Sequence, residues 1–437
     1  MTSHNIDRTV QPQRVAVSSI KIPTPDIIDL DNGFKVLVIN AGSQDLARVE
    51  VVFRAGTRYQ PKSLVANAAI SLLSEGTTSR TSQQIAEELD FYGSFLEPSF
   101  SRDFASVTFY TIGKHFYRSL DVFADIITNP NYPQHELELF CKKGKQSLLV
   151  DLEKVSTLSR QRFFSALFGS NHPYGSFAIP NDYDVLTQTD LVQFRNRYHK
   201  ASNGLIVIAG KVDAKQVDFL VNGFNNPIFE QCDDIELGLP SFTTTDYRVF
   251  SYKKDAVQAA LRIGRVLPKR NHPDMPGLVV LNTILGGYFG SRLMRNIRED
   301  KGFTYGISSF IIPMAELSAL VVSTEVGSAF TEKTVDEVFK EMIKLQTEPV
   351  SNDELELVRG YMTGQVLRTF DGPFAIADSL ASLFQYNNLD FEYINNLIRT
   401  INEITPTQLL GLAKKYLDVD RMVVSIAGSK RIRGYKE

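Results

Sequence analysis

The chain has 437 residues, of which 43% are hydrophobic and 22% are charged, and its formal net charge at pH 7 is −3. This length predicts two or three domains, and the composition is typical of a globular protein with a sizeable core. The charge leaves no electrostatic footprint for nucleic acid or an anionic membrane surface. No stretch approaches the roughly 18 apolar residues that a membrane-spanning helix needs.

Two features bear on the cellular compartment. The N-terminal sequence MTSHNIDRTVQPQR has no apolar region of the kind found in a signal peptide. The two cysteines, Cys141 and Cys232, are too few for a disulfide framework or a thiolate zinc site, and we interpret them as reduced thiols. We therefore expect a cytoplasmic protein.

Strands and helices are predicted from one end of the chain to the other. Strand-like stretches occupy residues 35–40, 47–54 and 104–112, and long helical patterns interleave with them. Strands grouped in pairs, rather than in strict βαβ alternation, favour an α+β fold with helices on one face of a mostly antiparallel sheet.

An internal repeat gives the clearest view of the architecture. Residues 51–76 align without gaps on residues 262–287, which places Arg54 on Arg265 and Gly76 on Gly287. Residues 186–211 align on 404–429, and in both a Thr-capped amphipathic helix leads into a strand ending in Ala-Gly. One duplication explains both matches.

The repeat predicts two homologous halves joined by a linker. We expect an N-terminal extension at residues 1–27, a first α+β half at 28–230, a linker at 231–247, and a second half at 248–437. The linker region is acidic and then rich in Pro, Ser and Thr, without a strong hydrophobic period.

The order of several motifs resembles the insulinase/pitrilysin family of zinc peptidases, which includes the mitochondrial processing peptidases. The resemblance extends from about residue 28 to about residue 430. Its most specific motif is the one at residues 285–308. The motifs are LDNGFKVLVIN at 30–40, FRAGTRY at 53–59, GTTSRTSQQIAEELDFYGSF at 76–95, NHPYG at 171–175 and LGGYFGSRLMRNIREDKGFTYGIS at 285–308.

The resemblance also predicts where a zinc site would lie. Active members carry His-x-x-Glu-His on the helix before the Gly-Thr pair, and a later glutamate completes the zinc coordination. Those positions are Asn67, Ile70, Ser71 and Ser147 in this sequence. None of these side chains is suited to bind zinc or to activate a water molecule at neutral pH.

No shift of the alignment restores the motif. The six histidines are isolated, and no two of them are four residues apart. We therefore expect no metal in this chain, and zinc in a partner subunit.

In heterodimeric relatives the subunit without zinc contributes an Arg and a Tyr seven residues apart. The resemblance carries these roles onto Arg298 and Tyr305. Without it, the charge run RNIREDK predicts a solvated helix face and Tyr305 predicts a packing residue. The preceding pair Gly286-Gly287 predicts a close-approach turn or an ordinary helix stop. Residues 323–327 are a candidate edge strand to which an extended peptide could add.

The leading hypothesis is a non-catalytic subunit of a heterodimeric zinc endopeptidase acting on short or unfolded peptides. It would be inactive alone, would pair with a homologous zinc-bearing subunit, and could form a homodimer when isolated. The alternatives are a structural or scaffold protein, or a peptide-binding protein without catalysis.

Overall fold

The computed structural model describes residues 9, 17, 24–229, 239–244, 246–387 and 389–437. Cys232, most of the expected N-terminal extension and much of the expected linker lie outside the described residues. Within the described part of the chain, no helix is long and apolar enough to cross a membrane.

The first half is built on a six-stranded sheet with the order β1-β2-β6-β3-β5-β4. β2 and β6 pair in parallel, and the other neighbours are antiparallel. The strands are β1 (Asp26–Asp29), β2 (Lys35–Asn40), β3 (Leu46–Phe53), β4 (Phe95–Phe100), β5 (Ala105–Ile112) and β6 (Gly204–Gly210).

The second half is built on a five-stranded sheet with the order β7-β11-β8-β10-β9. Here β7 and β11 are the parallel pair, and the remaining neighbours are antiparallel. The strands are β7 (Arg248–Tyr252), β8 (Gln258–Leu267), β9 (Ile307–Pro313), β10 (Ser318–Gly327) and β11 (Val423–Gly428).

Apart from β1, the two sheets have the same strand order and the same directions. This confirms the expected duplication of an α+β unit. The predicted Thr caps are also present, because the Thr187 and Thr405 side chains accept hydrogen bonds from the first turns of α6 (Gln188–Tyr198) and α13 (Pro406–Tyr416).

The residue alignment of the first repeat is wrong by one position within the strand. Ile206 and Val424 are equivalent in the second repeat, and their partners across the sheet are Val51 and Ile263. Val51 therefore corresponds to Ile263 and not to Arg262. Both Val51 and Ile263 are buried against the helices of their own half.

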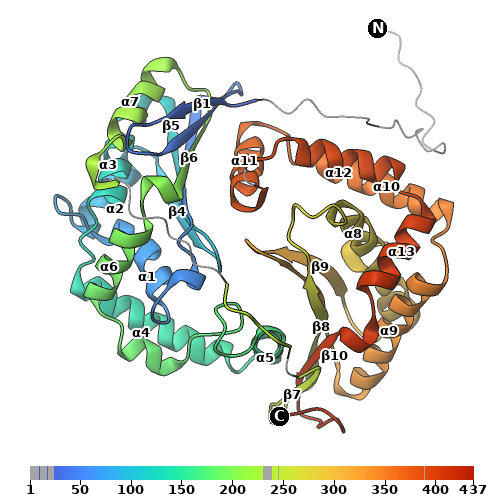
Figure 1. Cartoon of the computed structure of the whole chain (residues 1–437). Coiled ribbons are helices and arrows are strands. Elements are labelled where there is room, and N and C mark those ends of the chain that lie inside the picture. The colour runs from blue at the N-terminus through green and yellow to red at the C-terminus, as the bar shows by residue number, and fades with distance from the viewer. Residues whose placement is uncertain (1–8, 10–16, 18–23, 230–238, 245, 388) are drawn as a thin grey trace.

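Each sheet carries a layer of helices from its own half on its outer face (Figure 1). In the first half these are α1 (Val65–Ser71), α2 (Ser82–Phe91), α3 (Phe116–Thr128), α4 (Gln134–Asp151), α6 and α7 (Ala214–Phe224). In the second half they are α8 (Met275–Asn282), α9 (Thr331–Thr347), α10 (Asn352–Arg368), α12 (Glu392–Glu403) and α13.

The two halves also exchange a helix. The inner face of the second sheet packs against α5 (Val155–Phe168), which comes from the first half. The inner face of the first sheet packs against α11 (Pro373–Asn387), which comes from the second half. Two hydrogen bonds link α5 to β11. The Ser159 hydroxyl donates to the Ser425 backbone oxygen at 3.1 Å, and the Ser425 hydroxyl donates to the Ser159 backbone oxygen at 2.9 Å.

The expectation of an edge strand at residues 323–327 is wrong for Ser323 and Thr324, which pair on both sides, whereas residues 325–327 pair with β8 alone. These residues belong to β10, which is bonded to β8 on one side and to β9 on the other. The edge of the second sheet next to β10 is β9.

Candidate functional site

The helix at the expected zinc position is α1, and most of it is buried. Val65, Ala68 and Ile70 pack in the core of the first half, and Ile70 is only 1% exposed. Asn67 and Ser71 lie one helical turn apart on the partly open face. The Ser71 hydroxyl donates a hydrogen bond to Asn67 Oδ1 over 2.9 Å.

These residues do not fit a zinc site. An amide and a hydroxyl that already bond each other replace the two ligands, and the base position is an aliphatic side chain in the core. Ser147 is an exposed residue of α4. In the described part of the chain, no three His, Cys, Asp or Glu side chains form a group that could hold a metal. The absence of metal from this chain remains a prediction.

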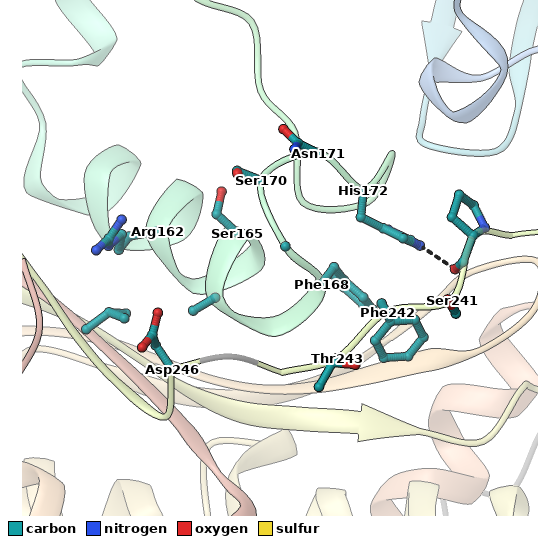
Figure 2. Close-up of a pocket in the computed structure, with 14 residues that line it drawn as sticks. Arg162, Ser165, Phe168, Ser170, Asn171, His172, Ser241, Phe242, Thr243 and Asp246 are labelled. Carbon is teal, nitrogen blue, oxygen red and sulfur yellow. Dashed lines mark hydrogen bonds between the residues drawn. The ribbon is translucent and has the colours of Figure 1, made fainter.

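The NHPYG motif forms the loop turn that follows α5. A pocket of about 520 Å³ is lined on one side by the end of α5 and the loop after it, and on the other by residues 240–243 of the expected linker (Figure 2). On one side of this pocket, His172 Nε2 lies 3.2 Å from the Pro240 carbonyl oxygen, and the His172 ring packs against Phe168 and Phe242. Burial lowers the pKa of His172. This histidine therefore fastens the linker to the first half.

A buried polar cluster joins two of the motifs that carry the family resemblance. Asp103 Oδ1 accepts hydrogen bonds from the Tyr174 hydroxyl at 2.5 Å and from Arg58 at 3.3 Å. Its Oδ2 accepts from the backbone N–H of Ala315, which belongs to the second half. Burial, and then the Asp103 carboxylate, raise the pKa of Tyr174, so its phenol remains a donor.

Sequence reasoning missed Asp103. Arg58 lies in FRAGTRY and Tyr174 in NHPYG, but nothing in the sequence around Asp103 marks it as their common partner. The one signal available was that Arg58 and Tyr174 lie in motifs of the family resemblance and had no assigned role.

The second-half motif begins with a close approach between helix and sheet. A Cβ at Gly286 would lie 2.7 Å from Ser309 Oγ and 2.8 Å from the Ser309 backbone nitrogen. Glycine is therefore needed where this segment crosses β9. The close approach expected at the Gly286-Gly287 pair is therefore present at Gly286.

Arg298 lies on a π-helical segment, Met294–Asp300, that follows the glycines. Ile297 anchors this segment in the core. The Arg298 guanidinium lies over the exposed ring of Phe289, with 4.7 Å between Cζ and the ring centroid. Among the residues that the structure describes, Arg298 forms no ion pair.

Tyr305 lies in the loop between that segment and β9, and it is 94% exposed. The backbone on either side of it is held in place. Thr304 Oγ1 lies 2.7 Å from the Glu325 carbonyl oxygen, and Thr324 Oγ1 lies 3.0 Å from Thr304 Oγ1 and 2.9 Å from the Gly306 carbonyl oxygen. A fixed turn thus presents the phenol to solvent.

The structure keeps the two sets of predicted site residues apart. Asn67, Ile70 and Ser71 belong to the first half, and Arg298 and Tyr305 to the second. Within the described residues, no hydrogen bond or ring contact joins the two sets. Arg298 and Tyr305 therefore lie apart from the side chains of α1 at the expected zinc position.

Comparisons with known proteins agree with this fold. Residues 35–168 match the family described as insulinase (peptidase family M16), and residues 186–361 match the peptidase M16 inactive domain. Among curated relatives, an uncharacterized zinc protease of Bacillus subtilis is 21% identical over 412 residues, covering 91% of this chain and 97% of that protein. One from Mycobacterium leprae is 22% identical over 407 residues, covering 89% and 88%.

Solved structures are similar over nearly the whole chain. A peptidase M16 inactive domain from Pseudomonas fluorescens superposes with a TM-score of 0.84 at 20% identity, covering 94% of this chain and 99% of that one. A protease from Helicobacter pylori gives a TM-score of 0.82 at 16% identity, covering 93% and 100%. With both halves of the duplicated fold matched and the zinc-motif positions replaced by Asn67, Ile70 and Ser71, this chain belongs to the insulinase (M16) peptidase family as a member without the zinc motif.

Proposed function

We propose that this chain is the non-catalytic subunit of a heterodimeric M16 endopeptidase that cleaves short or unfolded peptides. Its partner is a homologous chain that carries the zinc motif and the metal. This chain lends Arg298 and Tyr305 to the partner's zinc site.

The observation that carries the proposal is the contrast between the two motifs. The two side chains of α1 at the zinc-ligand positions are an amide and a hydroxyl, and the Ser71 hydroxyl donates a hydrogen bond to Asn67. The other motif instead presents Arg298 without an ion pair in the described residues, and Tyr305 almost fully exposed on a braced turn. An exposed tyrosine on a fixed loop contributes little to folding, and so a role outside the chain is favoured.

The chemistry of these two side chains suits peptide cleavage. A phenol O–H donates a hydrogen bond to the oxyanion that develops at the scissile carbonyl, and a guanidinium holds a peptide carbonyl oxygen. The turn that holds Tyr305 reduces the reorganisation needed at the moment of reaction.

The test is reconstitution. The isolated chain is expected to leave peptides intact, and a mixture with the zinc-bearing partner is expected to cleave them. In that mixture Arg298→Ala or Tyr305→Phe should lower kcat by about 10²-fold while the complex still assembles, because loss of one such donor costs about that much in other enzymes.

A matched control is Arg295→Ala, which removes an exposed arginine from the same π-helical segment. It should leave kcat within about twofold of the original value. If Arg298→Ala and Tyr305→Phe behave like this control, the shared-site proposal fails. Cell fractionation of the complex tests the cytoplasmic location that we include in the proposal.

A second candidate function is a scaffold without catalysis. One relative, the mitochondrial cytochrome b-c1 complex subunit 1 of Bos taurus, is 24% identical over 275 residues, covering 61% of this chain and 56% of that protein. Copurification of the native chain distinguishes the candidates. A single companion of similar length with His-x-x-Glu-His favours the peptidase, and a larger assembly without one favours the scaffold.

A further inference from the structure

A second cavity lies where α11 leaves its own half to cover the first sheet. In Figure 1, α11 lies next to α12, at the edge of the second half that faces the first half. The cavity opens to solvent, has a volume of about 600 Å³ and is lined by residues of α8, α10, α11, α12 and the adjoining strands. This size is within the range of small-ligand sites.

The wall of this cavity is mostly apolar. Met275 and Val279 come from α8, Ile311 comes from β9, and Ile394 and Leu397 come from α12. Such a wall favours a ligand with a hydrocarbon portion, because burial of apolar surface away from water is favourable.

Arg270 supplies a positive charge to this apolar wall. Its guanidinium lies 4.8 Å from the ring centroid of Tyr393 and 5.7 Å from that of Tyr386. Its Nη1 donates one hydrogen bond, to Ser382 Oγ at 2.6 Å. In the described part of the chain, Arg270 forms no ion pair, and so the remaining N–H groups of its fork have no anionic partner there.

Ser318 adds an independent observation. This first residue of β10 is fully buried, it lines the cavity, and its hydroxyl has no hydrogen-bond partner in the described structure. A buried hydroxyl without a partner is destabilising, and a ligand oxygen that accepts its hydrogen bond would remove this cost.

Other polar side chains on the wall already have partners. Ser379 donates to the backbone oxygens of Thr369 and Ala375, and Gln365 to the Tyr361 hydroxyl. Asp378 is the one acidic group that lines the cavity among the described residues, and its carboxylate pairs with Arg48 at 2.7 Å.

We propose that this cavity binds a small carboxylate with an apolar tail, with the carboxylate on Arg270 and Ser318 and the tail between α8, β9 and α12. A guanidinium fork matches a carboxylate in charge and geometry, whereas a dianionic phosphate would leave one charge uncompensated in apolar surroundings. The same chemistry is offered by a fatty acid and by the C-terminus of a peptide that ends in an apolar residue.

The experiment uses the full isolated chain, so its outcome is independent of the proposed partner. Octanoate is titrated calorimetrically, with octan-1-ol and octylammonium as matched ligands lacking the anion. Saturable binding of octanoate at one site, with the other two at least about tenfold weaker, is the expected result. A second arm compares N-acetyl-Leu-Leu with its C-terminal amide, and the tighter of the two carboxylates identifies the source.

Two variants locate the site. Arg270→Gln should weaken carboxylate binding at least about tenfold. Ser318→Ala should weaken it about threefold or more while leaving the thermal stability of the free chain unchanged or higher, because it removes an unpaired buried hydroxyl. The control is Arg399→Gln, an exposed arginine of α12 outside the cavity lining, which should bind like the parent chain.

Several results would overturn the proposal. These are no saturable binding of either carboxylate up to about 10 mM, octan-1-ol binding as tightly as octanoate, or undiminished binding in Ser318→Ala together with Arg270→Gln. If Arg270→Gln fails to fold, Ser318→Ala alone decides, since its fold is expected to persist.

Discussion

His199 is enclosed in the first half in a way that favours its neutral form. Its ring stacks on Phe53 with 4.7 Å between centroids, and its Nε2 is buried without a hydrogen-bond partner in the described structure. Burial, and then the nearby charge of Arg195, lower the pKa of His199 to about 3. The ring therefore contributes packing and no charge near neutral pH.

This burial predicts a dependence of stability on pH. The folded chain keeps His199 neutral, whereas the unfolded chain binds a proton below about pH 6.5, and so stability is lost as the pH falls from about 6.5 towards 3. His199→Phe removes this proton uptake and keeps the stacking. Between pH 7 and 4.5 the parent chain should lose about 2 kcal/mol more unfolding free energy than the variant, as measured by urea unfolding.

The matched control for this prediction is His135→Gln, on the exposed surface of α4. It should lose as much stability over the same pH range as the parent chain. Equal losses in the parent chain and in His199→Phe would contradict the prediction.

At the scale of the element, the turn around Tyr305 depends on hydroxyls from two segments. Thr324 of β10 is buried, and its Oγ1 bonds Thr304 and Gly306 on either side of the tyrosine. Thr324→Val keeps the shape of the side chain and removes these bonds. The free energy of unfolding should fall by only about 1 kcal/mol.

In the proposed heterodimeric peptidase, the same Thr324→Val change should lower kcat several-fold and leave KM nearly unchanged, because on that proposal a looser turn positions Tyr305 less well in the transition state. Thr334→Val is the control, since it removes a buried hydroxyl bonded to the Phe330 backbone oxygen within α9. A control that lowers kcat as much as Thr324→Val would show that general destabilisation is the cause.

Sequence patterns predicted elements well where one face of the chain is buried. The strands at 35–40 and 47–54 were located within a residue of β2 and β3, and the two Thr-capped helices predicted within 186–211 and 404–429 are α6 and α13. Turns and helix caps depend on neighbouring residues in the chain, and they can therefore be recognised from a single sequence.

The alignment of β3 on its equivalent β8 was not predicted correctly from the sequence. All of β3 from Ala47 to Phe53 is buried, because its inner face is covered as well as its outer face. The strand still alternates, because Arg48 and Glu50 lie on its inner face between Ala47, Val49 and Val51 on its outer face. The ungapped alignment followed Arg54 and Gly76 instead of this alternation, and it therefore placed Val51 on Arg262.

The candidate site was predictable only through its motif. The family resemblance assigned roles to Arg298 and Tyr305, but neither the exposure of Tyr305 nor the ring of Phe289 under Arg298 follows from local pattern. The Arg58–Asp103–Tyr174 cluster depends on contacts between segments about 45 to 116 residues apart, and no periodicity encodes such contacts.

At the scale of the whole molecule, the exchanged helices make each half part of the other's core. Leu380 of α11 is fully buried and belongs to the same core cluster as Leu37 of β2 and Leu205 of β6, which lie in the first half. The reciprocal arrangement holds for Phe163 of α5, which packs with Val249 and Val423 of the second sheet. The duplicated units therefore cannot complete their cores independently, which favours one cooperative unfolding transition.

Leu380→Ala tests this dependence. The cavity it leaves should lower the unfolding free energy by about 3 kcal/mol. Although the substitution lies in the second half, the amides of β2 and β6 should lose protection from hydrogen exchange together with those of α11, because both sides of the interface share one core. Hydrogen exchange followed by mass spectrometry of the full chain measures this. Leu367→Ala, at a half-exposed position of α10, should leave all three segments as protected as before. If only α11 loses protection, the halves are energetically separate and the exchanged helix merely rests on the first sheet.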